Sequence, residues 1–138
     1  MSTVAANEPR RPLPLPTPLT EEYWDAAAAG RLLYARCNRC GQVQFPREFA
    51  CVACQSLDVS WVEGTGKGRV YSYTVIHREP FPDFPVPAVM AIVDLDEGYS
   101  MFSNIVDCPR DRLRCDMPVE VTFERQPDGF VLPVFRPA

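Results

Sequence analysis

Two pairs of cysteines constrain this chain more than any other feature. The sequence reads Cys37-Asn-Arg-Cys40 and, after ten further residues, Cys51-Val-Ala-Cys54. Two thiolates separated by two residues bind one ion from a single tight turn, and two such turns complete the tetrahedron that zinc adopts with four sulfur ligands. Because four protein ligands leave no open position for substrate or water, the pattern predicts a structural zinc site. Iron in the same site and a set of unrelated buried cysteines are the alternatives that the pattern leaves open.

The residues after each cysteine pair indicate how the turns are shaped. Gly41 directly follows the first pair and supplies the left-handed backbone that such a turn prefers. Gln55 occupies the matching position after the second pair and is expected to adopt the same conformation at a small cost in strain. The remaining cysteines, Cys108 and Cys115, lie seven positions apart and do not repeat the spacing. We therefore expect them to be free thiols.

The bulk composition limits the size and class of the protein. A chain of 138 residues is expected to form one domain or two very small ones, for which a bound metal is a useful source of stability. The net charge of −4, with thirteen arginines and one lysine, gives no overall basic field for nucleic-acid binding. No apolar run approaches the roughly 20 residues that cross a bilayer, and the N-terminus lacks the apolar core of a signal peptide. We therefore expect a cytoplasmic protein, in which reduced cysteines favour a metal site over disulfides.

The chain divides into four segments by composition. Residues 1–19 hold five prolines and are expected to form an extended arm, which is either a strap across a partner or a disordered tail. Residues 20–31 predict a helix, which Gly30 would end in the left-handed conformation. Residues 32–64 carry the cysteine pairs between short apolar pieces, and residues 65–138 read as strands separated by turns.

The predicted helix is short and amphipathic. Thr20 is a suitable N-cap, and two glutamates follow it in the first turn. Spacing places Trp24, Ala27 and Ala28 on one face. Ten residues form a marginal helix in water, so we expect this one to depend on docking Tyr23 and Trp24 on a surface. That surface belongs either to this chain or to a partner.

Five strand candidates follow three glycines, Gly64, Gly66 and Gly68, which we expect to form a flexible spacer. The second candidate is apolar on both faces and is therefore expected to be central. Glycine-containing pairs at 97–98 and 128–129 indicate hairpin turns. Five strands in roughly 70 residues suit a small closed barrel. The candidates are Arg69–His77, Ala88–Leu95, Tyr99–Val106, Val119–Phe123 and Phe130–Phe135.

The chain offers few groups for catalysis on its own. His77 is its single histidine, and no GxSxG motif is present, so a serine or cysteine triad is unsupported. His77 is expected to share a strand face with Tyr71, Tyr73 and Val75. It is either an exposed polar end of that face or a hydrogen-bond donor to a ligand at the barrel mouth. An independent hydrolase would have to use Cys108 with His77.

Two loops carry further candidate contacts. Four prolines stiffen residues 79–87 and present Phe81 and Phe84, which either meet a partner or an acyl chain or cover the end of the barrel. Another loop carries three alternating arginines, with Arg112 in the middle. These arginines either clamp the phosphates of a ligand such as coenzyme A or form a solvated surface.

These motifs together resemble a known family of zinc-ribbon plus OB-fold proteins associated with acyl-CoA enzymes, long classed as a domain of unknown function. The resemblance covers about residues 20–138. It is specific in the combination of the four-cysteine ribbon with VYSYTVIHR at residues 70–78. The segments TEEYWDAAAAGRLLYARCNRCGQVQFPR, GTGKGR, AIVDLDEG, FSNIV, MPVEVTFE and LPVFRPA complete it. The chain departs from the family pattern at Val52, Gln55 and Asp116, which bears on local turn shape and not on the metal.

The resemblance implies a mostly β fold: an N-terminal helix, a rubredoxin-like zinc ribbon and a C-terminal five-stranded OB-fold barrel. It also implies a companion subunit of a thiolase-like aldolase, thiolase or acyltransferase, or of a hot-dog-fold hydratase, that acts on acyl-CoA thioesters. Catalysis would then lie in the partner. Some members of the family are thought to contact coenzyme A between ribbon and barrel. The zinc ligands alone carry over firmly: Cys37, Cys40, Cys51 and Cys54.

The leading hypothesis is therefore a non-catalytic subunit of a hetero-oligomer, with structural zinc and a coenzyme A thioester as candidate ligands. It predicts neither a nucleic acid nor a membrane as partner. A single-stranded nucleic-acid-binding module is the alternative, because OB barrels and ribbons also do that work. Candidate contacts to a ligand or a partner are Tyr23, Trp24, Tyr73, His77, Phe81, Phe84 and Arg112.

Overall fold

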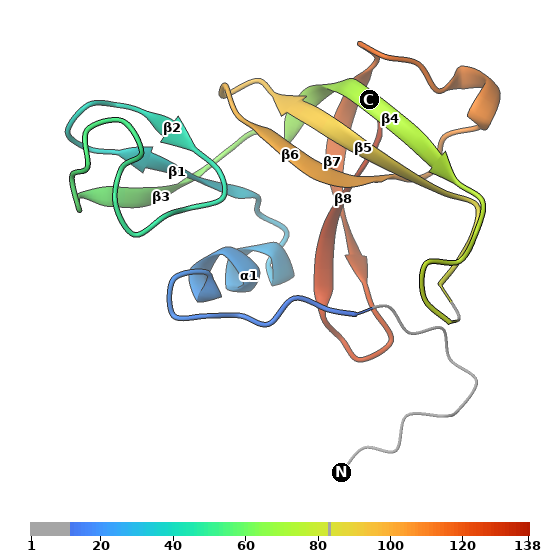
Figure 1. The fold of residues 1–138 in the computed structure, drawn as a ribbon, viewed down its shortest axis with the longest axis horizontal. Helices are drawn as coiled ribbons and strands as arrows, with labels where there is room; N and C mark the ends of the chain where they lie inside the picture. Colours follow the sequence, from blue (N-terminus) through green and yellow to red (C-terminus); the bar gives the residue numbers. More distant parts are fainter. Residues whose placement is uncertain (1–11, 83) are drawn as a thin grey trace.

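The computed structural model describes residues 12–82 and 84–138, which form a small three-stranded sheet, one α-helix and a closed barrel. Figure 1 shows the three-stranded sheet on one side, the barrel on the other, and the helix beneath the place where they meet. This arrangement confirms the mostly β fold expected from the sequence. Residues 1–11 of the predicted arm lie outside the described residues, and residues 12–17 adopt no regular secondary structure.

The helix α1 spans Glu21–Ala28. Thr20 stands at the N-cap position, but its side chain does not cap the helix; the Thr20 Oγ1 instead accepts a hydrogen bond of 2.9 Å from the Thr17 backbone N–H. The position of the N-cap was therefore predicted correctly, but the hydrogen bond expected from its side chain to the helix is not formed. Gly30 has a φ of 81° and ends the helix as expected.

The buried face of α1 differs from the predicted one. Tyr23, Ala26 and Ala27 are buried, whereas Trp24 is half-buried and Ala28 is exposed. The face that enters the core therefore runs from Tyr23 through the positions three and four residues later, one step away from the predicted stripe. Tyr23 packs within the chain itself, which answers the question of what surface stabilises the helix.

The zinc-ribbon sheet contains three antiparallel strands in the order β2-β1-β3. They are β1 (Leu33–Cys37), β2 (Val43–Gln44) and β3 (Val59–Glu63). Strand β1 lies in the middle and ends on the first cysteine of the first pair, so the sheet places that pair directly.

The five remaining strands close into a barrel in the order β4-β5-β6-β8-β7, which confirms the predicted barrel. A 3₁₀ turn, η1 (Arg110–Arg112), lies between β6 and β7. All five predicted strands are present, with ends shifted by one to two residues except for the second, whose bounds agree. The strands are β4 (Lys67–Ile76), β5 (Ala88–Leu95), β6 (Ser100–Ile105), β7 (Pro118–Arg125) and β8 (Val131–Pro137).

One expectation about the barrel faces is wrong, and another is confirmed. Strand β4 has a bulge between Val70 and Ser72, which turns Tyr71 outward at 65% exposure. Because the bulge adds a residue, Tyr71 does not share the inner face that Tyr73 and Val75 reach. Strand β5 lies between β4 and β6, as expected of a central strand, although the apolar residues of its outer face are not all covered and Met90 is 41% exposed.

The predicted glycine spacer is ordered structure. Gly68 belongs to β4 and pairs with Leu95 on one side and Val119 on the other. Gly66 is buried with a φ of 72° and its carbonyl accepts a hydrogen bond from the Val121 N–H. Glycine is needed here because the backbones of neighbouring strands approach closely, and not because the segment must bend freely.

One carboxylate fixes the connection between ribbon and barrel. Glu97, in the β5–β6 turn, accepts hydrogen bonds at one oxygen from the Thr65 backbone N–H (2.6 Å) and hydroxyl (2.8 Å). Behind this contact, aromatic rings from the helix, the ribbon and the barrel pack together: Tyr23 on Phe45 and Trp61, and Tyr99 on Tyr34 and Phe45. Burial raises the pKa of Tyr99 above its usual range, with the nearby Glu97 adding to the effect, so this ring stays neutral.

Removing the Glu97 carboxylate is expected to loosen this connection. The Glu97→Ala change deletes two hydrogen bonds to an ionised acceptor, and we expect the free energy of unfolding to fall by about 1–2 kcal/mol in urea titrations. The control is Glu48→Ala, since Glu48 is exposed and makes no hydrogen bond or ion pair within residues 12–82 and 84–138. Equal stability of the two variants would show that the Glu97–Thr65 hydrogen bonds do not hold the connection between ribbon and barrel.

Within the described part of the chain, no helix has the length and apolar character of a membrane span.

Candidate functional site

The four predicted metal ligands converge at one point of the ribbon. The Sγ atoms of Cys37, Cys40, Cys51 and Cys54 lie within 4.8 Å of one another. The Cys37–Cys54 pair is separated by 3.6 Å and the Cys40–Cys51 pair by 3.5 Å. Sulfurs at about 2.3 Å from a tetrahedral zinc ion lie roughly 3.8 Å apart, so the cluster fits zinc with little adjustment.

The backbone prepares some of these sulfurs for the thiolate form. Hydrogen bonds from the Cys54 and Ala53 N–H groups, outweighing burial, lower the pKa of Cys51 to about 6. The Cys40 N–H lowers the pKa of Cys37 in the same way. The pKa of Cys40 rises to about 12, because burial and the neighbouring sulfurs outweigh the hydrogen bond from the Gln42 N–H. Four thiolates therefore require a cation among them, which is the charge that a bound zinc ion supplies.

Both turns have the predicted backbone. Gly41 has a φ of 78° and Gln55 a φ of 62°, so the second turn adopts the left-handed conformation without glycine. In each turn, the backbone N–H of the residue after the cysteine pair donates a hydrogen bond to the carbonyl of the first cysteine. Gly41 donates to Cys37 at 3.0 Å, and Gln55 donates to Cys51 at 2.9 Å. The two turns are thus matched, as the cysteine spacing indicates.

Polar side chains that the sequence analysis did not single out support the turns. Gln44 is 6% exposed, and its amide oxygen accepts a hydrogen bond of 3.1 Å from the Val52 N–H beside the second pair. Asn38, within the first pair, donates to Asp58 (2.9 Å) and Ser60 (2.7 Å). Hydrogen bonds of this kind to the turns that carry the ligands help to orient the metal ligands. A glutamine is polar and has no ligand spacing, so the sequence carried no signal for its burial.

A second feature is an uncharged face on the outside of the barrel, which we call the β4–β6 face. Pairing of β4, β5 and β6 sets Thr74, Met90 and Asn104 in one row and Ser72, Ile92 and Phe102 in the next. Phe102 is 72% exposed and forms a ridge between two shallow hollows. In a chain with 23% charged residues, an uncharged surface that exposes Met90 and Phe102 is typical of a contact with another molecule.

The predicted contact residues do not form one cluster. Tyr23 is 5% exposed inside the aromatic packing, so little of its side chain faces outward. Trp24 is half-buried against Phe130, with ring centroids 5.1 Å apart. Tyr73 is half-buried and its hydroxyl donates to the Leu113 carbonyl at 3.2 Å, which ties β4 to the segment after η1.

The other predicted contacts lie at the surface. His77 is exposed just after β4, and Arg112 is exposed in η1. Phe81 is 47% exposed in the proline loop, and its ring centroid lies 6.4 Å from that of Phe84. Within residues 12–82 and 84–138 no hydrogen bond joins His77 to Cys108, the pair that a hydrolase would need; the Cys108 thiol donates to the Pro109 carbonyl.

Comparison with known proteins places both parts of the chain in one family. Residues 24–60 match the model described as "ChsH2, rubredoxin-like zinc ribbon domain" and residues 61–124 match "ChsH2, C-terminal OB-fold domain". A "DUF35 domain-containing scaffold protein" of Methanocaldococcus jannaschii is 38% identical over 97 residues, which cover 68% of each protein. The chain belongs to the DUF35 family. The expected resemblance is thereby confirmed.

Relatives of the DUF35 chain include named parts of acyl-CoA enzymes. The "Probable enoyl-CoA hydratase alpha subunit" of Thermomonospora curvata is 39% identical over 84% of this chain, which spans 36% of that relative's length. The "Benzoylsuccinyl-CoA thiolase subunit BbsA" of Geobacter metallireducens is 34% identical over 63% of this chain and 58% of its own.

A solved structure also matches the DUF35 chain closely. It is described as "Ltp2-ChsH2(DUF35) aldolase" and superposes with a TM-score of 0.83 at 36% identity. The match covers 91% of this chain and 98% of the other, so the helix, ribbon and barrel all correspond.

Proposed function

We propose that this chain is an auxiliary subunit that docks on a thiolase-like enzyme, holds no active site of its own, and helps to order the acyl-CoA site of that enzyme. The observation that carries the proposal is the near-complete structural match to a chain from an aldolase described as Ltp2-ChsH2(DUF35). Similarity to a benzoylsuccinyl-CoA thiolase subunit and to an enoyl-CoA hydratase subunit supports the class of substrate.

The metal centre has a structural role in this proposal. Four sulfurs fill a tetrahedral site, and the family model for this segment is a zinc ribbon, so we assign zinc to Cys37, Cys40, Cys51 and Cys54. A zinc ion held there polarises no substrate, because no ligand position is open. Its contribution is to fix the ribbon, which in turn holds Phe45 and Trp61 against α1.

The β4–β6 face is the surface that we assign to the enzyme subunit. Protein interfaces lose charged residues at their centres and gain aromatic residues and methionine, as this face does with Phe102 and Met90. The complementary surface should therefore be apolar, uncharged and hollowed to accept the Phe102 ring. A nucleic acid fits poorly, because the two rows of this face carry no cation to meet phosphates.

Replacing the exposed ring tests the assignment. We expect Phe102→Asp to weaken binding to the thiolase-like enzyme by at least about tenfold, since a central aromatic contact contributes on the order of 2 kcal/mol. The measurement is the dissociation constant of the two purified subunits. Leu57→Asp is the matched control, because Leu57 is similarly exposed, at 67%, but lies on the ribbon. If Leu57→Asp weakened binding and Phe102→Asp did not, the interface would lie on the ribbon and not on the β4–β6 face.

The auxiliary role itself is tested by activity. The enzyme subunit should lose activity or solubility when it is produced without this chain, whereas the isolated, zinc-loaded chain should not hydrolyse acyl-CoA thioesters. Full activity of the enzyme subunit alone would remove the auxiliary role. The contacts to the enzyme or its ligand that we propose remain those named from the sequence, and cytoplasmic action remains the proposed setting. They are Tyr23, Trp24, Tyr73, His77, Phe81, Phe84 and Arg112.

A further inference from the structure

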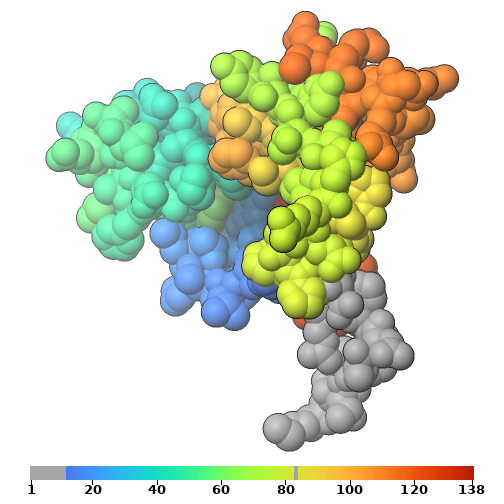
Figure 2. All heavy atoms as spheres, turned by 45° about the vertical axis from the view of Figure 1, so that its right-hand side comes forward, coloured from blue at the N-terminus to red at the C-terminus, as the bar shows by residue number. Residues whose placement is uncertain are grey.

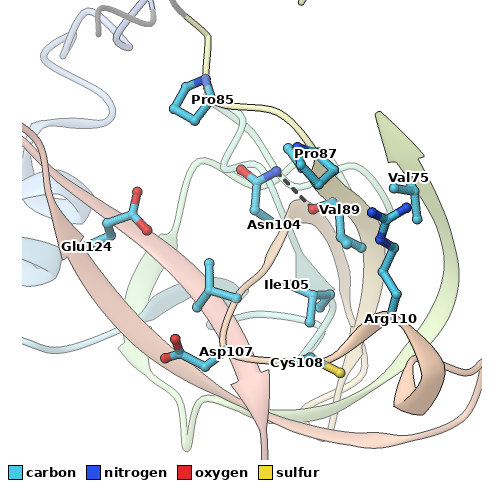
Figure 3. A pocket seen from close by; sticks show the side chains of 12 residues that line it. Val75, Pro85, Pro87, Val89, Asn104, Ile105, Asp107, Cys108, Arg110 and Glu124 are labelled. Atoms are coloured by element: carbon cyan, nitrogen blue, oxygen red, sulfur yellow. Dashed lines mark hydrogen bonds between the residues drawn. The ribbon is translucent and has the colours of Figure 1, made fainter. Parts of the chain in front are cut away.

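A cavity of about 610 Å³ opens beside the proline loop at one end of the barrel (Figure 3), and none of the four zinc-ribbon cysteines lines it. Three segments distant in sequence build it: residues 85–89 from the loop and β5, residues 104–110 from β6 to η1, and Glu124 on β7, with Val75 of β4 completing the wall. Its volume lies in the range of small-molecule sites, roughly 300–1,000 Å³. Figure 2 shows the proline loop, in yellow-green, standing on the surface of the molecule.

Most of the wall is apolar. Val75, Val89 and Ile105 come from the inner faces of three barrel strands, and Pro85 and Pro87 come from the loop. Proline has no N–H, so the loop side adds few donors. The amide of Asn104 is already engaged, since it donates to the Val89 carbonyl at 3.0 Å, the bond drawn in Figure 3. The apolar part of this wall suits a hydrocarbon chain, and the five polar or charged residues of the lining suit a polar head group.

The charges are separated along the cavity. In Figure 3 the Arg110 side chain lies on the side of Val75 and Pro87, whereas Glu124 and Asp107 lie on the opposite side. Arg110 takes part in none of the three ion pairs that residues 12–82 and 84–138 form. Arg110 is exposed beside the apolar wall, and its planar guanidinium can bind a carboxylate or phosphate through two hydrogen bonds.

We propose that this cavity binds an amphiphile whose apolar chain lies along the Val89 wall and whose anionic head group, a carboxylate or phosphate, contacts Arg110. The carboxylates of Asp107 and Glu124 direct the head group away from their side by repulsion. The site needs only this chain, so it goes beyond the proposed docking function and can be tested without the enzyme subunit.

The two free cysteines provide a built-in reporter. Cys108 is half-buried and lines the cavity, whereas Cys115 is exposed and lies at a different hollow, with Arg69 and Asp116. The full, zinc-loaded chain is treated with iodoacetamide, a neutral reagent, and alkylation at each site is followed by mass spectrometry. We expect decanoate and decyl phosphate to slow alkylation of Cys108 and to leave Cys115 unchanged. Whichever probe protects at the lower concentration identifies the head group.

The matched variants are Arg110→Gln and Arg114→Gln, which remove two arginines four positions apart; Arg110 lines the cavity, whereas Arg114 is exposed and does not line it. Because the charged contact is lost, Arg110→Gln is expected to raise the half-protecting concentration of decanoate about tenfold. Arg114→Gln is expected to leave this concentration unchanged. Decyltrimethylammonium, with the opposite charge, should not protect. Equal protection of both cysteines, no protection by either anion, or identical behaviour of the two variants would overturn the proposal.

Discussion

Serine at position 51 is expected to abolish metal binding and to unfold the ribbon. Cys51 is 2% exposed, and its sulfur lies 3.5 Å from that of Cys40, so a shorter, harder oxygen can neither reach the ion nor replace a thiolate. Structural zinc supplies an apparent 10–16 kcal/mol, roughly, at neutral pH, which is comparable to the whole stability of a small protein, about 5–15 kcal/mol. Cys51→Ser should therefore show no zinc per chain by elemental analysis and broad, poorly dispersed NMR resonances for residues 33–63.

The matched control is Cys115→Ser. Cys115 is exposed and belongs to no cluster of potential ligands among the described residues. It should keep one zinc per chain and the stability of the parent protein. A folded Cys51→Ser protein that holds no zinc or iron would show that the ribbon does not depend on a metal, and the structural role assigned to the cluster would then be wrong.

Alanine at position 68 is expected to be the most damaging single-methyl change in the barrel. A Cβ at Gly68 would overlap the backbone carbonyl of Asp94, which is part of β5 and cannot turn aside as a side chain does. Because Gly68 pairs with Leu95 and Val119 on its two sides, either β4–β5 or β4–β7 pairing must give way. We expect Gly68→Ala to lower the free energy of unfolding by at least about 3 kcal/mol, the upper end for overpacked sites.

Gly98→Ala separates this steric effect from ordinary backbone strain. Gly98 has a φ of 98°, but a Cβ there meets nothing within 4 Å, so the expected cost is about 1–2 kcal/mol of conformational strain. Urea unfolding of both variants measures the difference. If Gly68→Ala is no less stable than Gly98→Ala, β4 is not held between its neighbours as described.

Local spacing was enough to predict much of this fold. The cysteine spacing predicted the convergence of four sulfurs and even the left-handed conformation at Gln55, because a metal-binding turn allows few backbone shapes. Alternation and turn residues located all five barrel strands, and β5 to the residue. These features depend on residues close together in the sequence, for which pattern and geometry are directly linked.

Features that depend on distant residues were not predictable in the same way. The bulge that turns Tyr71 outward follows from how β4 meets β5, and the apolar run of β5 concealed the exposure of Met90. The buried face of α1 is set by Phe45 and Trp61, which receive Tyr23. The cavity beside Arg110 is lined by residues from four strands, so no spacing along the sequence indicates it.

The barrel closes through very little pairing between β6 and β8. Strands β6 and β8 pair at a single position, Ile105 with Phe135, whereas β4 and β5 pair at eight. Beyond that position the Ser103 hydroxyl bridges to the Pro133 carbonyl at 2.9 Å, and Tyr23 and Trp24 of α1 line the hollow beside it. Helix α1 thus covers the part of β8 that does not pair with β6. A barrel cut free from residue 65 onward would present that strand edge to water, so the chain folds as an interdependent whole.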